Sequence, residues 1–218
     1  MTDKCYLLSG LGADGYVFQY LDFEGVEVEY MEWLSPLPKE TLPAYAKRMA
    51  QKITTPHPIL VGLSFGGMVA MEIAKLIPVK KIILISSAKE RKELPCFYRF
   101  SAKLKLQKIL PYTLIKRTNG FTYWLFGATS AHEKALLEEI FRKTPTTFLK
   151  WAINAILTWQ NTEISAHILH IHGDKDRILP YKNVKNAYCI VGGGHSMIVN
   201  RAHEITPLIN KFLNNAND

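Results

Sequence analysis

The hydrophobic pattern of the chain alternates between short apolar runs and longer stretches with helical spacing. Uninterrupted or nearly uninterrupted runs lie at 6–8, 59–63, 81–85 and 167–172. Runs of this kind are typical of strands that are buried on both faces of a parallel sheet. A strict alternation of apolar and polar residues at 26–30 predicts a half-exposed strand, and residues 187–191 predict one more.

The stretches between these runs predict helices. Apolar residues recur every three or four positions over 42–53, over 65–76 and over 205–213, where Pro207 is expected in the first helical turn. Strands that alternate with helices imply a sheet covered on both faces. We therefore predict an α/β fold with a mostly parallel, doubly wound sheet.

The segment 88–164 breaks this alternation. It contains no strand-like run, and Ser130 with Glu133 has the spacing of a capping box at a helix start. We expect a helical insertion in a single α/β core formed by 1–87 and 165–218. The predicted helices of the insertion cover 95–110, 112–126, 130–143 and 145–159.

Composition limits the class of protein. A chain of 218 residues with 48% hydrophobic and 21% charged residues is long enough for one sizeable core. No apolar run approaches the roughly 20 residues of a membrane span, and the first residues lack the pattern of a signal peptide. We expect a cytoplasmic protein. The three widely spaced cysteines suit buried reduced thiols better than disulfides or a metal site.

The net charge of +8 is concentrated in one part of the chain, since nine basic and two acidic residues lie between Lys89 and Arg117. This concentration argues against a nucleic-acid partner. A solvated helix face would explain it, and so would attraction of an anionic substrate or acidic partner. Composition leaves the oligomeric state open.

The stretch 59–68 carries the strongest chemical signal. An apolar strand ends at Gly62-Leu63-Ser64-Phe65-Gly66, and an apolar helical pattern follows. A serine in such a turn has strained backbone angles, and the flanking glycines allow strand and helix to approach. The turn would expose the Ser64 hydroxyl and place the Phe65 N–H at a helix N-terminus, where negative charge is stabilised. A Gly-rich turn without catalytic function would show the same pattern.

Two further strand ends supply what a nucleophilic serine needs. Serine requires a histidine that takes its proton, and the histidine requires a carboxylate that orients it. Asp176 follows the strand at 167–172, and His195 follows the strand at 187–191. Because the carboxyl ends of parallel strands meet at one edge of the sheet, we expect Ser64, Asp176 and His195 to converge there.

With these motifs the chain resembles the α/β-hydrolase superfamily outside the helical insertion. The matching residues are Gly62 to Gly66, His172-Gly173-Asp174-Lys175-Asp176 and Gly193-Gly194-His195. The resemblance implies that the acid is the third residue after Gly173, which selects Asp176 over Asp174. In the first loop, Ser9-Gly10-Leu11-Gly12, Ser9 replaces the family's usual histidine. The chain also lacks the two leading strands of larger members, so it looks like a compact version.

The resemblance further implies an oxyanion hole formed by the backbone N–H groups of Leu11 and Phe65. It implies that the segment 88–164 is a lid over the active site. Aromatic residues gather in that segment, and we expect the substrate pocket to be lined by Trp124, Trp151 and Phe97.

Two other motifs point to different chemistry. Gly10-x-Gly12-x-x-Gly15 matches a dinucleotide-binding loop, but that interpretation would make Ser64, Asp176 and His195 a coincidence. His170-x-His172-x-Asp174 is the beginning of a metallohydrolase motif, but lysine stands where the next histidine is expected. Hydrogen-bonded core histidines explain that pair better. We therefore expect neither a metal nor an organic cofactor.

The sequence predicts a serine hydrolase that cleaves an ester or thioester of a small acyl compound through an acyl-enzyme. The aromatic lid favours an apolar acyl or alkyl group. The basic segment favours an anionic remainder, as in a carboxylated or carrier-bound acyl chain. Two alternatives stay open: a C–C bond hydrolase or lyase with the same three residues, and a non-catalytic ligand-binding protein of the same fold.

Overall fold

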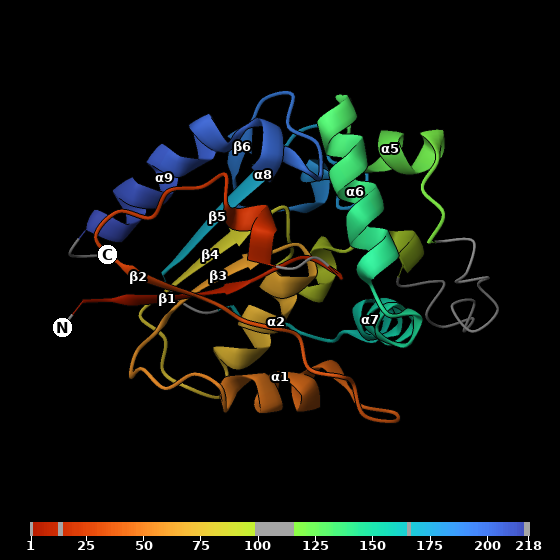
Figure 1. Cartoon of the computed structure of the whole chain (residues 1–218). Coiled ribbons are helices and arrows are strands. Elements are labelled where there is room, and N and C mark those ends of the chain that lie inside the picture. Colours follow the sequence, from red (N-terminus) through yellow and green to blue (C-terminus); the bar gives the residue numbers. More distant parts are fainter. Residues whose placement is uncertain (1, 13–14, 99–115, 165–166, 216–218) are drawn as a thin grey trace.

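The computed structural model describes residues 2–12, 15–98, 116–164 and 167–215. Its centre is a six-stranded sheet in the order β2-β1-β3-β4-β5-β6, in which every neighbouring pair is parallel. The strands are β1 (Lys4–Leu8), β2 (Glu27–Tyr30), β3 (Ile59–Leu63), β4 (Lys81–Ile85), β5 (Ile168–Gly173) and β6 (Tyr188–Ile190). The predicted doubly wound sheet is confirmed (Figure 1).

The central strands are apolar at nearly every position because both faces of the sheet are covered. In β3, Ile59 and Val61 join one buried cluster while Leu60 joins the cluster on the other side. In β4, Ile82 and Ile83 divide in the same way. Complete burial of one such side chain stabilises the fold by roughly 1.5–3 kcal/mol.

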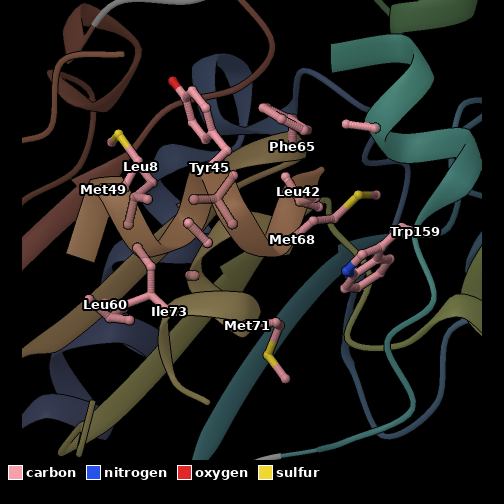
Figure 2. Packing of buried hydrophobic residues seen from close by; sticks show 14 of the residues in the cluster. Leu8, Leu42, Tyr45, Met49, Leu60, Phe65, Met68, Met71, Ile73 and Trp159 are labelled. Carbon is pink, nitrogen blue, oxygen red and sulfur yellow. The ribbon is translucent and has the colours of Figure 1, made fainter. Parts of the chain in front are cut away.

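Different helices cover the two faces of the sheet (Figure 1). On one side, α1 (Leu42–Ala50) and α2 (Phe65–Ile73) pack on the sheet. Figure 2 shows part of this packing, in which Tyr45 of α1 lies beside Phe65 of α2, and Met49 of α1 lies beside Leu8 of β1. On the other side lie η1 (Gly15–Phe18), α8 (Met197–Asn200) and α9 (Ala202–Asn214).

The described part of the segment between β4 and β5 is helical, as the sequence predicts. After η2 (Arg91–Glu93) it contains α5 (Gly120–Phe126), α6 (Ala131–Lys143) and α7 (Thr146–Thr158). The capping box of Ser130 and Glu133 begins α6. The predicted helix over 95–110 lies mostly outside the described residues, as does the first part of 112–126.

The helix α7 belongs to the core as well as to this segment. Its residues Phe148, Ala152 and Ala155 lie in the same buried cluster as α1 and α2. Beyond its end, the Trp159 indole donates a hydrogen bond of 2.7 Å to the Glu72 carboxylate in α2. The Trp159 ring, labelled in Figure 2, thus connects α7 to the helix that follows Ser64.

Two details differ from the expectations. Pro207 lies within α9 rather than in its first turn, because α9 begins at Ala202. Cys96 is exposed, whereas Cys5 is buried, and neither forms a disulfide. Burial, and then the charge of Asp3, raise the pKa of Cys5 to about 12. None of the described helices is long and apolar enough to cross a membrane.

Candidate active site

Three loops at the carboxyl edge of the sheet bring Ser64, Asp176 and His195 together. Ser64 lies between β3 and α2, Asp176 follows β5, and His195 follows β6. The Ser64 Oγ is 2.9 Å from the His195 Nε2, and the His195 Nδ1 is 2.7 Å from the Asp176 Oδ2. At these distances His195 can accept a proton from the Ser64 hydroxyl while its other ring nitrogen stays hydrogen-bonded to Asp176.

The backbone of Ser64 is held in an unusual conformation, with φ 52° and ψ −117°. Residues with a side chain rarely adopt a positive φ, and such strain persists only where surrounding contacts maintain it. Here the Ser64 N–H donates to the Ile85 carbonyl at 2.9 Å, and the Ser64 carbonyl accepts from the Ser87 hydroxyl at 2.6 Å. These bonds hold the turn that projects the Ser64 hydroxyl toward His195.

The glycines on either side of Ser64 are required by close backbone approach. A Cβ at Gly62 would lie 2.3 Å from the Gly67 Cα, and a Cβ at Gly66 would lie 2.1 Å from the Leu8 carbonyl oxygen. Both distances are far shorter than a non-bonded contact. The glycines therefore allow α2 to pass directly over β1 and β3.

Gly66→Ala is expected to lower the free energy of unfolding by about 3 kcal/mol or more, because a rigid backbone carbonyl occupies the space of the added methyl group. Urea denaturation followed by circular dichroism would measure this change. Gly120→Ala is the matched control, since nothing lies within 4 Å of a Cβ at Gly120. Equal stability of both variants would contradict the close packing described above.

The carboxylate of Asp176 is buried and fully engaged. Its Oδ1 accepts hydrogen bonds from the backbone N–H groups of Ile178 and Leu179, at 2.9 and 2.8 Å. Its Oδ2 faces His195 and also lies 3.3 Å from the His172 Nε2. Burial alone would raise the pKa of Asp176, but His195 and the hydrogen bonds from His172 and His195 hold that pKa well below its ordinary value. Asp176 is therefore an anion at neutral pH.

Backbone donors flank the Ser64 hydroxyl. Phe65 is the first residue of α2, so its N–H is one of the groups that have no acceptor within the helix. The loop after β1 lies beside Ser64, because a Cβ at Gly10 would be 3.7 Å from the Ser64 Cβ. Leu11 follows in that loop and lines the same cavity as Ser64. The two residues predicted for an oxyanion hole thus lie in segments next to the serine, Phe65 at the start of α2 and Leu11 in the loop after β1.

An apolar cavity of about 520 Å³ opens onto Ser64 and His195. One wall comes from α6 and α7, with Leu136, Ile140 and Ile153 among the side chains. Phe97, which the sequence predicts as a pocket residue, also lines the cavity. Among the described lining residues the one charged side chain is Glu133. The cavity therefore suits an uncharged, apolar group.

The other two predicted pocket residues lie elsewhere, which corrects that expectation. Trp124 is 54% exposed, stacks on Phe121 and lies under the Arg177 guanidinium. Trp151 packs against Tyr45, and its indole N–H donates to the Glu40 carbonyl at 2.8 Å. Both rings pack against residues outside the cavity, and neither is among the described residues that line it.

The apolar residues that form most of the helical wall were not among those predicted from the sequence. The signal was present, because apolar residues at helical spacing in α6 and α7 provide the wall: Leu136, Leu137, Ile140, Phe141, Leu149, Ile153 and Ile156. Glu133 was also missed as a lining residue. Its carboxylate accepts from the Thr129 and Ser130 N–H groups and from the Asn200 side chain, which connects α6 to α8 beyond His195.

The two motifs for cofactors do not converge on a ligand site. His170 and His172 are buried and hydrogen-bonded, with 3.3 Å between the His172 Nδ1 and the His170 Nε2. Within the described residues no group of three or more His, Cys, Asp or Glu side chains has the arrangement of a metal site. At Gly12, in the possible dinucleotide loop, the Thr144 side chain occupies the space beside the backbone, since a Cβ there would lie 1.8 Å from the Thr144 Oγ1.

The basic segment is only partly described. Lys89 is buried and forms an ion pair of 2.9 Å with Glu93, and the Arg91 guanidinium donates to the Trp159 carbonyl. These two cations are therefore structural rather than part of a solvated face. Arg99 and the lysines at 103, 105 and 108 lie outside the described residues.

Comparison with known proteins agrees with the architecture. Residues 5–207 match a model of the alpha/beta hydrolase family. No curated protein matches the sequence. An esterase from Exiguobacterium antarcticum superposes with a TM-score of 0.74 at 17% identity, over 97% of this chain and 91% of that one. A hydrolase from Oleispira antarctica gives 0.73 at 15% identity, over 99% and 92%.

An enol-lactonase from Burkholderia xenovorans LB400 gives a TM-score of 0.70 at 15% identity, over 98% of this chain and 92% of that one. At these identities the similarity concerns the fold alone. The family match covers most of the chain and includes Ser64, Asp176 and His195. The chain belongs to the alpha/beta hydrolase family.

Proposed function

We propose that the protein is a serine hydrolase that cleaves an ester or thioester through an acyl-enzyme. The observation that carries this proposal is the continuous hydrogen-bonded row from the Ser64 Oγ through His195 to Asp176, which opens into an apolar cavity. A serine that only stabilised a turn would need neither the histidine nor the buried anion behind it.

The reaction proceeds in two steps of the same kind. In the first, the Ser64 Oγ attacks the acyl carbon while the His195 Nε2 takes its proton, and His195 then protonates the leaving alcohol or thiol. In the second, water attacks the acyl-enzyme with His195 as base, and Ser64 recovers its proton as the acid is released. Asp176 keeps the Nδ1 proton of His195 in place and stabilises the imidazolium.

Charge develops on the carbonyl oxygen in both steps. The N–H groups of Phe65 and Leu11 are proposed to hold this oxygen, each contributing about 3–4 kcal/mol in comparable sites. Phe65 has the additional advantage of its place at the N-terminus of α2. The negatively charged oxygen would form next to these two N–H groups.

The cavity wall supports an apolar acyl or alkyl group as the bound part of the substrate. We propose that α6 and α7, together with Phe97, act as a lid domain that shapes this group's site. An anionic or carrier-bound remainder would have to lie outside the cavity, since its described lining contains no lysine or arginine.

Labelling with a fluorophosphonate probe tests the proposal directly. Such a probe phosphonylates a serine only when a neighbouring base activates it. We expect one adduct per wild-type chain, located at Ser64 by peptide mass spectrometry, and none in Ser64→Ala. Absence of labelling in the folded wild type would refute the hydrolase and favour a ligand-binding protein. Labelling without turnover of simple esters would favour C–C bond chemistry by the same residues.

The cavity predicts a preference for longer acyl chains. Each additional buried methylene is expected to raise kcat/KM by about fourfold, because its transfer from water contributes about 0.8 kcal/mol. A series of p-nitrophenyl esters from acetate to decanoate measures this, and the increase should stop once the cavity is full. Rates independent of chain length would contradict the proposed binding of an acyl group in the cavity.

A further inference from the structure

A second row of polar side chains lies buried behind Asp176 and takes no part in the steps above. It runs from His172 through His170 to Lys89 and Glu93, and each of these four side chains belongs to a residue that is between 0% and 5% exposed. The residues come from β5, from the loop after β4 and from η2. Burying an ion pair next to two imidazoles is costly unless every donor has an acceptor.

The direction of the hydrogen bonds fixes where each proton lies. The Lys89 ammonium can only donate, and its three acceptors are the His170 Nδ1 at 2.8 Å, the Glu93 Oε1 at 2.9 Å and the Lys185 carbonyl at 2.5 Å. His170 must therefore carry its proton on Nε2. That N–H donates to the Ser87 carbonyl at 3.1 Å and lies 3.3 Å from the His172 Nδ1.

The same reasoning applies to His172. Its Nε2 lies 2.7 Å from the Leu179 carbonyl, which can only accept, so Nε2 carries the proton and Nδ1 is free to accept from His170. The same Nε2 is 3.3 Å from the Asp176 Oδ2. Each donor in the row thus points from Lys89 toward the carboxylate of Asp176.

The charges around the row keep the His170 imidazole neutral. Protonation of His170 would place a second N–H against the Lys89 ammonium. Burial of the ring, followed by the charges of Lys89 and His172, holds the pKa of His170 well below its ordinary range. Tyr98 lies near Asp176, Tyr181 lies near His172, and Cys189 is the register partner of His172 in β6. Burial, and then Asp176, raise the pKa of Tyr98 to about 12, and burial likewise raises that of Tyr181, so both are neutral.

We propose that His172 is a positioning residue for Asp176, and that Lys89, paired with Glu93, fixes the proton positions of His170 and His172 that this role requires. The proposal rests on the proposed hydrolase function. Through Ser87 the row also reaches the nucleophile, since the Ser87 carbonyl accepts from His170 while its hydroxyl donates to the Ser64 carbonyl. One buried network therefore braces both the acid and the serine.

Loss of the His172 donor has a definite electrostatic consequence. The Asp176 Oδ2 would keep His195 as its side-chain partner but lose the second N–H that shares its charge. A less stabilised carboxylate holds a protonated His195 more strongly. Since only neutral His195 can accept the Ser64 proton, the acid limb of the kcat/KM profile should move to higher pH.

The first test is nitrogen NMR of the histidines in the full wild-type chain and does not depend on activity. At neutral pH we expect both His170 and His172 to show an unprotonated Nδ1 and a protonated Nε2. His170 should keep this state from about pH 5.5 to about pH 8, where an ordinary histidine titrates. Titration of His170 in this range, or a proton on either Nδ1 at neutral pH, would overturn the proposal.

The second test compares His172→Leu with His172→Gln, whose amide can still donate to the Leu179 carbonyl and Asp176. In His172→Leu we expect kcat for a p-nitrophenyl ester to fall by roughly 10-fold to 100-fold, with an unchanged KM and an acid limb about 0.5–1 pH unit higher. In His172→Gln most of the rate and the wild-type pH profile should return. Equal rate losses in both variants, or an unmoved acid limb in His172→Leu, would reduce His172 to a structural residue and overturn the proposal.

Lys89→Met/Glu93→Gln removes both buried charges together, so no unpaired ion remains to unfold the chain. Because His170 stays buried in this variant, we expect it to remain neutral but to populate the tautomer that carries the proton on Nδ1 as well as the one with the proton on Nε2. A His170 proton position unchanged from wild type would refute the role of Lys89. These outcomes can be told apart from a failure of the proposed hydrolase function. If the wild-type protein shows the expected proton positions but is not labelled by fluorophosphonate, the hydrolase activity is refuted and the buried network is not.

Discussion

Ser64→Ala is expected to reduce kcat for ester hydrolysis by roughly six orders of magnitude, because the attacking atom is removed while the rest of the site stays. The fold should tolerate the change, since alanine and serine are equally strained at the positive φ of this position. Steady-state rates with a p-nitrophenyl ester, together with unchanged circular dichroism and thermal unfolding, measure both expectations. Binding of a non-hydrolysable ester analogue should persist because the cavity is intact.

Ser86→Ala is the matched control. Ser86 directly follows the neighbouring strand β4 and shares the positive φ of Ser64. It is buried, and within the described structure its hydroxyl has no hydrogen-bond partner. Removing an unsatisfied buried hydroxyl should leave both rate and stability close to wild type. A similar loss of rate in both variants would mean that any disturbance of the sheet edge inactivates the protein, and Ser64 would lose its assigned role.

Asp176→Asn is expected to lower kcat by about 10⁴-fold, the loss typical of the wrong histidine tautomer. The asparagine carbonyl would take over the Ile178 and Leu179 N–H groups from Oδ1, so its NH₂ group would face the His195 Nδ1. The imidazole would then have to carry its proton on Nε2, toward Ser64, and could not act as a base. KM should change little, because Asp176 is not among the described cavity-lining residues.

Asp174→Asn provides the comparison within the same loop. Asp174 accepts a hydrogen bond from the Gly192 N–H at 2.6 Å through an oxygen that asparagine retains, and it does not contact His195. We expect nearly wild-type rates. If Asp174→Asn were the inactive variant and Asp176→Asn the active one, the choice of Asp176 as the acid would be wrong.

The parts of the fold that the sequence predicts are those governed by local spacing. Apolar runs such as 59–63 and 81–85 form β3 and β4. A strand that is covered on both faces needs apolar side chains on both, so its sequence is apolar at nearly every position. The meeting of Ser64, Asp176 and His195 was predictable for a different reason. Parallel strands end at one edge, so residues that follow β3, β5 and β6 lie on the same side of the sheet, where their loops can bring them together.

Directions of side chains on helices were not predictable. The helix α7 is apolar on two faces, one toward Tyr45 and Phe65 and the other toward the cavity, so residue type alone could not decide which face carried Trp151. The row behind Asp176 was equally hidden. His170 and Lys89 are 81 positions apart, and only the fold shows that a lysine decides where the histidine keeps its proton.

The helix α7 contributes both to the core and to the cavity wall, and this limits how substrate specificity can change by mutation. Its residues Phe148 and Ala152 complete the main core, whereas Ile153 and Ile156 face the cavity one position or one turn away. Mutations that reshape this wall will often disturb core packing and be removed by selection for folding. In the part of this wall that α6 provides, Leu136 faces the cavity but belongs to neither buried cluster, so it has more freedom to vary. New substrate preferences should therefore arise through α6 first, and directed libraries placed there should yield more folded members.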